Sequence, residues 1–348
     1  MDGGESANQA TAFPRVSAIR PDTQSLLLTL LLAFIAFLVV TPLFLLLLNS
    51  FQIGKPGGEV IYGLEGWRLA FTSRGIVEAV YNSFSLAITR QIIATITGIF
   101  LAWLLARTDI PMKGGLEFMF WLSFFLPALP VTLGWILLLD PKYGLLNQLL
   151  SKIPFMQASP FDIYSYWGII WVHLATTGVS LKVMLLTPAF RNLDASLEES
   201  SRVAGAGPIT TLLRIIVPVM MPVLLVSTIL GLIRSLEAFE IELILGVPIG
   251  LHVFSTKIYS FVTHEPAQFP PATALGTFFL LILLSLVALQ RLYLGQRSFV
   301  TVTGKGFSTR PISLGRWRYP VFAVVLLIAL SITLLPMAFL LLGTFMRL

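Results

Sequence analysis

Few side chains in this sequence could perform chemistry, and the sets that define common enzyme classes are missing. The chain contains no cysteine, and its three histidines, His173, His252 and His264, do not have the spacing of a metal site. It has neither a G-x-x-x-x-G-K-[ST] phosphate loop nor an H-E-x-x-H zinc motif. We therefore expect no catalytic residue, no metal site and no bound cofactor in this chain, ATP included.

The most informative polar segment, residues 192–208, contains start and stop signals for a short helix. Ser196 and Glu199 have the S-x-x-E spacing of a capping box. Gly205 suits the left-handed position just after a helix, and Pro208 suits the first turn of the next one. The short helix would offer a partner small side chains and two charged ones: Ser200, Ser201, Ala204, Ala206, Glu199 and Arg202.

A second polar cluster consists of Arg234, Glu237 and Glu240, with Glu242 close by. The spacing of the first three residues would place them on one helical face. They could form an acidic mouth that favours a cationic substrate. The alternative is a structural ion pair at a solvated helix end.

The elements that must position these residues are strongly apolar. Of 348 residues, 56% are hydrophobic and 11% are charged, whereas a soluble domain has about 25% charged residues. A helix needs roughly 20 apolar residues to cross the ~30 Å hydrocarbon core, and an isolated strand would leave its backbone unpaired there. We predict an all-α membrane bundle with seven spans: 25–48, 82–106, 116–139, 166–189, 210–233, 271–292 and 320–345.

Lysine and arginine are distributed unevenly between the two sets of loops. With the N-terminal tail, residues 1–24, in the cytoplasm, the cytoplasmic loops hold thirteen of them and the opposite loops hold seven. This bias favours a cytoplasmic N-terminus and places 192–208 on the cytoplasmic side. Loop 49–81 is either a cap over the bundle or an ordinary connector.

Two cations fall inside predicted spans. Arg90 should either snorkel to the interface or pair with another helix, rather than line a pathway, and Lys182 should snorkel to the cytoplasmic end. His173 should be satisfied by a neighbouring helix.

The two ends of the chain resemble each other. Pro42 and Phe51 recur 294 residues later as Pro336 and Phe345, and transporters are often built from repeats. We expect residues 25–300 to form one six-helix domain. Residues 301–348 would then be the linker and first helix of a second, truncated domain.

The segment after Ser196 resembles a known family motif. Permease subunits of binding-protein-dependent ABC importers carry E-A-A, three residues, Gly, nine residues, Ile, one residue, Leu-Pro. The chain reads Glu199-Ser-Ser, three residues, Gly205, nine residues, Ile215-Ile-Val-Pro218, so both alanines are serines and the leucine is valine. Softer similarity to the same permease family covers Asn82–Ser83 and Leu101–Asp109. Four further segments resemble the ferric-iron branch of that family, in which two halves are fused: Leu133–Asn147, Arg234–Glu240, Thr301–Phe307 and Leu314–Trp317.

The resemblance implies a transport subunit rather than an enzyme. A cytoplasmic ABC ATPase dimer would bind ATP and Mg²⁺ and receive the short helix. A periplasmic or lipid-anchored substrate-binding protein would dock on the other side, and a second permease half would complete the pathway in the bacterial inner membrane. We expect no contact with nucleic acid.

Alternatives remain for both substrate and mechanism. Ferric iron is the first expectation, and polyamine, thiamine, phosphonate or sulfate are the alternatives within the family. An ion-coupled secondary transporter would need acidic residues at the centre of a span, and no predicted span has one. A membrane-embedded enzyme is disfavoured by the missing catalytic set.

Overall fold

The computed structural model describes residues 23–53, 59–153, 159–295 and 311–345. It consists of two units, residues 1–48 and 49–348, which are described separately. The first unit contains nearly all of helix α1 (Thr23–Asn49), an apolar helix with Pro42 inside. The predictions for linker 301–307 and for most of the N-terminal tail lie outside the described residues.

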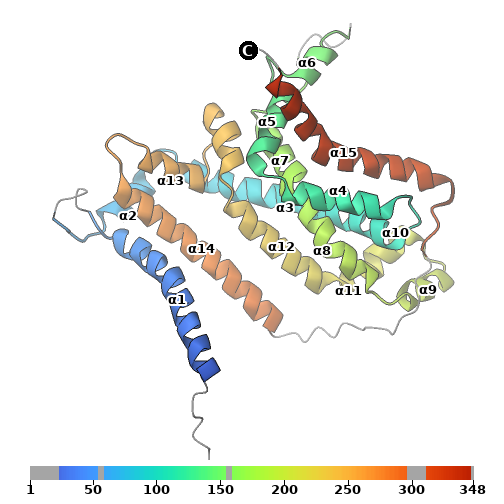
Figure 1. Cartoon of the computed structure of the whole chain (residues 1–348), viewed down its shortest axis with the longest axis horizontal. Coiled ribbons are helices and arrows are strands. Elements are labelled where there is room, and N and C mark those ends of the chain that lie inside the picture. The colour runs from blue at the N-terminus through green and yellow to red at the C-terminus, as the bar shows by residue number, and fades with distance from the viewer. Residues whose placement is uncertain (1–22, 54–58, 154–158, 296–310, 346–348) are drawn as a thin grey trace, which may run out of the picture. The chain divides into compact units, whose positions relative to one another are not determined.

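All regular elements in the described part of the second unit are helices, and the other backbone pairing consists of two isolated bridges. Three of its elements are π-helical turns, η1, η2 and η3, and two are 3₁₀ turns, η4 and η5. In chain order the elements (Figure 1) are α2 (Glu65–Thr72), α3 (Ile76–Arg107), α4 (Lys113–Phe125), α5 (Ala128–Leu139), α6 (Leu145–Leu150), α7 (Tyr166–His173), η1 (Leu174–Gly178), α8 (Val179–Arg191), α9 (Ser196–Val203), α10 (Pro208–Thr211), η2 (Leu212–Ile216), α11 (Val217–Val219), α12 (Met221–Leu236), η3 (Glu242–Gly246), η4 (Val247–Ile249), α13 (Phe254–Val262), α14 (Phe269–Gly295), η5 (Gly315–Trp317) and α15 (Arg318–Thr344).

Five helices among the described residues are long and apolar enough to cross a membrane. Three bent helix pairs pass the same test, which brings the number to eight if each pair is one span. The all-helical membrane fold is therefore confirmed, whereas the predicted count of seven spans stays a prediction.

The predicted span 116–139 is bent by 103° between α4 and α5, so this pair of helices is either one broken span or a re-entrant loop. Pro127 disfavours helical geometry at the residue before it. Leu126 accordingly has ψ 132°, an extended conformation, and α4 ends there.

The predicted span 210–233 is also bent, by 76° at Met220. Pro218 and Pro222 lie on either side of Met220, and each lacks the N–H that a continuous helix requires. The region 234–270, which lies between the predicted spans 210–233 and 271–292, contains a third bent pair, Glu242–Ile249 and Phe254–Val262, at 80°. Gly250, with φ 73°, provides the turn between its two arms.

Helices α3 and α8 pack together through the core of the second unit. Their approach is close at Gly98, where a Cβ atom would lie 2.2 Å from the Cβ of Lys182. Helix α15 packs along α5 and α4. At Gly134 of α5, a Cβ atom would lie 2.1 Å from the carbonyl oxygen of Pro336 in α15.

The chain just before α15 is held at the end of α3. Ile312 donates its N–H to the Arg107 carbonyl at 2.8 Å, and Asp109 donates its N–H to the Ile312 carbonyl at 3.1 Å. The Leu314 N–H donates to the Asp109 carboxylate at 2.9 Å. The start of α15 therefore lies at the same end of the unit as the end of α3.

Loop 49–81 contains helix α2, which packs on α14. Phe71 meets Phe278 of α14 edge to face, with ring centroids 5.0 Å apart. Gly66 lies directly against Pro270, the second residue of α14. Ala70 of α2 is part of a small apolar core with Ala274 and Leu275, and Trp67 packs against it, whereas Phe71 is exposed.

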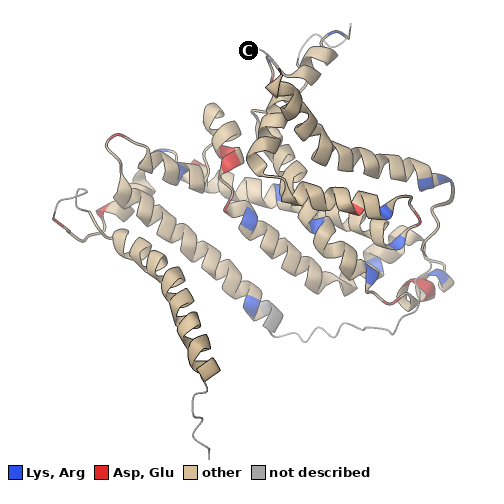
Figure 2. Cartoon of the chain, in the orientation of Figure 1, with Lys and Arg blue, Asp and Glu red and all other residues tan. Residues whose placement is uncertain are grey.

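Charged side chains gather near the ends of the helices of the second unit, and the long apolar helices are mostly uncharged along their length (Figure 2). The end that carries α9 is rich in basic residues: Arg107, Lys113, Arg191, Arg202, Arg214, Arg316 and Arg318. In a membrane protein, such a basic end is typical of the cytoplasmic side.

The contact at Gly134 predicts a stability effect. Gly134→Ala should destabilise the protein by about 1–3 kcal/mol, because the added methyl group would overlap the α15 backbone. Gly114→Ala in α4 is the matched control, since a Cβ there meets no atom within 4 Å. Thermal unfolding of the purified protein in detergent measures both, and equal unfolding temperatures would contradict the α5–α15 contact.

Candidate functional site: an exposed short helix and a charged cavity

Helix α9 begins at Ser196, one residue earlier than the capping box requires. Asp194 provides the start instead, because its carboxylate accepts the Ser196 N–H at 2.9 Å. This hydrogen bond favours the charged form and lowers the pKa of Asp194. The predicted capping box is therefore wrong, because Ser196 lies inside the helix and its side chain makes no capping bond.

The end of α9 follows the prediction. Gly205 has φ +82°, the left-handed conformation that glycine adopts without strain. Its N–H donates to the Arg202 carbonyl at 2.9 Å, and the Ala206 N–H donates to the Ser201 carbonyl at 3.0 Å. These two bonds form a Schellman motif, and Pro208 opens α10 as predicted.

One side of α9 is attached to the membrane helices. Glu198 forms a 2.7 Å ion pair with Arg107, the last residue of α3, and both side chains are buried. Arg107 also donates to the Leu193 carbonyl at 3.4 Å. Ser201 is buried and hydrogen-bonded to Thr211 of α10 at 2.8 Å. Ser201 therefore holds α9 in place, and its predicted position on the partner-facing side is wrong.

The other side of α9 is free in the described structure. It consists of five exposed residues, which we call the α9 face: Ser196, Glu199, Ser200, Arg202 and Val203. Val203 is apolar and 91% exposed. Sequence reasoning missed Val203 and Glu198. An apolar residue in a short polar helix could have drawn attention to Val203, whereas Glu198 differs from its neighbour Glu199 only through the contact with Arg107.

The last two motif residues lie beyond α9. Ile215 is half-buried in the π-helical turn η2, and Pro218 is exposed in α11 next to the bend at Met220. They therefore lie in the bent helix that follows α9 and not on the α9 face.

Arg234, Glu237 and Glu240 come together at a cavity of about 620 Å³. Thr176 and Thr177 of η1 and the ring of Phe239 line the same cavity. The predicted common helical face is wrong, because α12 ends at Leu236 and Glu237 follows it as the cap residue. The three charged side chains share the cavity because the chain turns between α12 and η3.

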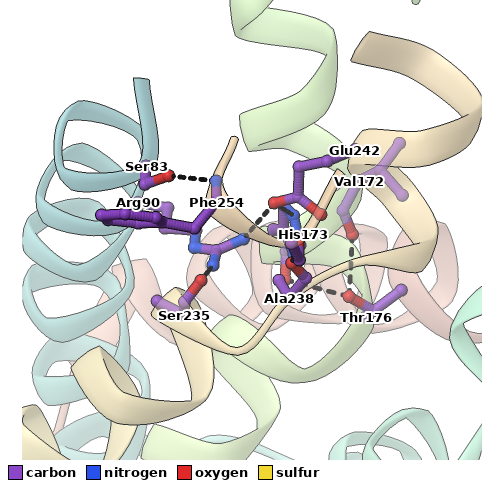
Figure 3. Close-up of polar contacts among 10 residues, drawn as sticks. Ser83, Arg90, Val172, His173, Thr176, Ser235, Ala238, Glu242 and Phe254 are labelled. Carbon is purple, nitrogen blue, oxygen red and sulfur yellow. Dashed lines mark hydrogen bonds and ion pairs between the residues drawn. The ribbon is translucent and has the colours of Figure 1, made fainter. Parts of the chain in front are cut away.

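Glu242 does not belong to this cavity. It is buried, and its Oε1 atom lies 3.2 Å from Nη1 of Arg90 and 2.7 Å from Nε2 of His173 (Figure 3). Arg90 also donates to the Ser235 carbonyl. Arg90 thus makes the interhelical pair that was one of the two expectations for it, and His173 has a partner from another element, as predicted.

Lys182 is fully buried and donates its ammonium to the Ser227 carbonyl of α12. Its predicted snorkelling is wrong, because Gly98 leaves room for the side chain between α3 and α12. Among the described residues, no group of three His, Asp or Glu side chains could hold a metal ion.

Comparisons with known proteins identify the class. No protein-family model matches the chain. A Haemophilus influenzae protein named as a ferric transport system permease is 28% identical over 285 residues, which cover 81% of this chain and 43% of that protein. The ferric transport system permease of Actinobacillus pleuropneumoniae is 32% identical over 127 residues, 36% of this chain and 18% of that one. The chain thus spans less than half the length of these ferric relatives.

Other similar permeases are named for other cargo. They include the sulfate permease of Salmonella typhimurium, 26% identical over 63% of this chain and 78% of its own length. A molybdenum permease of Escherichia coli is 27% identical over 47% of this chain and 70% of its own length.

A solved structure shares the fold. It is a bacterial alginate ABC transporter in complex with a periplasmic protein that carries an alginate pentasaccharide, and the TM-score is 0.64. The match covers 80% of this chain and 96% of that chain at 22% identity. The chain is therefore a homologue of ABC importer permeases and has an ABC transporter permease fold.

The buried pair beneath α9 gives a testable prediction. Glu198→Ala should lower the free energy of local unfolding of α9 by about 3–5 kcal/mol, because it leaves the Arg107 charge buried without its partner. Amide hydrogen exchange across 196–203 should become faster, because these amides exchange when α9 opens locally and that opening would cost less free energy. The matched control is Glu199→Ala, which removes an exposed carboxylate from the same helix and should leave exchange nearly unchanged. Equal exchange in the two variants would show that the pair does not hold α9.

Proposed function

We propose that the chain is a pathway-forming permease of an ATP-driven importer and that the α9 face is the docking surface for a cytoplasmic ABC ATPase. The observation that carries this proposal is a short helix with one side anchored by Glu198 and the other side exposed, including Val203. A free helix face that ends in an exposed apolar residue suits insertion into a groove of a partner.

The proposed orientation of the chain in the membrane rests on the distribution of its basic residues. The basic residues around α9 support a cytoplasmic position for this end of the unit, and with it a cytoplasmic N-terminus in the bacterial inner membrane. Because the chain spans less than half of its ferric relatives, a second permease half completes the pathway in this proposal.

The anchoring contacts provide a route for mechanical coupling. ATP and Mg²⁺ would be bound by the partner ATPase. Its closure would displace α9, and the Arg107–Glu198 pair would transmit that displacement to α3 as a rigid body. A substrate-binding protein would deliver cargo at the opposite end of the unit.

Ferric iron is the proposed cargo. Ferric permeases are among the relatives, and the cavity presents Glu237 and Glu240. Sulfate is the second candidate, since a sulfate permease is also similar and Arg234 lines the same cavity. An ion-coupled secondary transporter has less support, because the buried acid Glu242 is already paired with Arg90.

Docking can be tested at Val203. Val203→Asp should weaken ATPase binding by about 2 kcal/mol, or roughly thirtyfold, because a carboxylate would have to enter an apolar contact. The measurement is the amount of ATPase that co-purifies with the complete importer. Val77→Asp is the control, since Val77 is 78% exposed near the other end of α3. Undiminished ATPase binding by the Val203 variant would overturn the proposal.

The cargo proposal can be tested at the cavity. The double variant Glu237→Gln and Glu240→Gln should reduce ferric uptake by roughly tenfold at equal expression, because the two charges would no longer attract a cation. Glu65→Gln removes an exposed carboxylate of α2 and should have no effect. Normal ferric uptake by the double variant would exclude these residues from cation selection.

A further inference from the structure

The side chain of Arg90 lies at the edge of the charged cavity. It lines a small recess of about 40 Å³, and four residues line both this recess and the cavity: His173, Thr177, Leu181 and Arg234. The guanidinium is buried, and its Nε atom has no hydrogen-bond partner among the described residues. A positive charge at this point would act directly on the contents of the cavity.

Glu242 offsets that charge. Its carboxylate contacts Arg90 Nη1 at 3.2 Å, and its side chain is almost completely buried, so little water screens the pair (Figure 3). Arginine remains protonated in proteins. The pair is therefore neutral as a whole while Glu242 is ionised.

The charged residues that line the cavity itself do not sum to zero charge. Arg234 carries one positive charge, whereas Glu237 and Glu240 carry two negative ones. No ion pair joins these three residues in the described structure. The excess is one negative charge, and an uncompensated Arg90 would cancel it.

We propose that the Arg90–Glu242 pair is a specificity determinant. Glu242 neutralises Arg90, so that Glu237 and Glu240 give the cavity a negative potential and cationic cargo is favoured over anionic cargo. The charge preference is a property of the cavity, and its use in transport rests on the proposed function, in which the cavity lies on the cargo's path.

A charge-reporter experiment tests this proposal directly. The chain has no native cysteine, so Thr177→Cys places a single thiol on the exposed cavity wall. The full chain in membranes is treated with a cationic or an anionic methanethiosulfonate reagent. The rate of thiol modification by the cationic reagent is divided by the rate for the anionic reagent. This ratio is then divided by the same ratio for Tyr143→Cys, an exposed position that does not line the cavity.

The proposal predicts a specific pattern of ratios. Adding Glu242→Gln should lower the ratio by roughly threefold to tenfold, because the charge on Arg90 is no longer offset. Adding Arg90→Gln to that variant should restore the ratio, since the pair is neutral again. Glu242→Asp should keep the parent ratio. A purely structural role would leave the double variant as perturbed as the single one.

The outcomes separate the inference from the function it rests on. An unchanged ratio in Glu242→Gln, or an unrestored ratio in the double variant, would overturn the electrostatic role whatever the transport result. Ferric uptake by the complete importer should fall in Glu242→Gln and recover in the double variant. If the ratios follow the pattern and uptake does not, the charge inference holds and the cavity is not on the transport path.

Discussion

Hydrocarbon provides no hydrogen-bond partner, so every backbone carbonyl that a helix break releases inside a membrane must be satisfied by the protein itself. The second unit contains several such interruptions, and polar side chains from neighbouring helices compensate for them. Ser123 of α4 donates to the carbonyls of Ala175 and Thr176 in the π-helical turn η1, at 3.3 and 3.1 Å. Arg90 donates to the carbonyl of Ser235, in the last turn of α12. Backbone satisfaction therefore determines where buried polar residues occur.

This constraint divides the charged residues into two classes. Arg90 and Lys182 are used inside the protein, where they bind main-chain carbonyls of α12. Other charges are exposed, and they include those on the α9 face and at the cavity that holds Glu237 and Glu240. An exposed short helix and an acidic cavity are compatible with an apolar bundle because the buried charges have polar partners: Arg90 pairs with Glu242, and Lys182 binds a carbonyl.

Local signals in the sequence predicted local structure well. The left-handed Gly205 and the helix start at Pro208 depend on the chemistry of those residues alone, and both are found. The apolar runs predicted membrane helices for the same reason. Their bends did not follow from the presence of proline alone: the helix pair around Pro127 is sharply bent, whereas Pro42 lies within α1 without ending it.

Long-range contacts could not be predicted in this way. Glu240 and Glu242 are two residues apart, yet one lines the cavity and the other pairs with Arg90, because the chain turns between them. Glu198 and Glu199 are adjacent, and only the contact with Arg107 distinguishes the anchoring residue from the exposed one. Such assignments require partners that are about 90 to 150 residues away in the sequence.

The central claim is that the exposed side of α9 meets an ATPase, and site-specific cross-linking tests it most directly. A photoreactive amino acid at position 203 should capture a P-loop ATPase subunit in native membranes when the complete importer is present. The same group at position 77, near the far end of α3, should not. Capture from position 77 but not from position 203, or no ATPase adduct from either, would contradict the account.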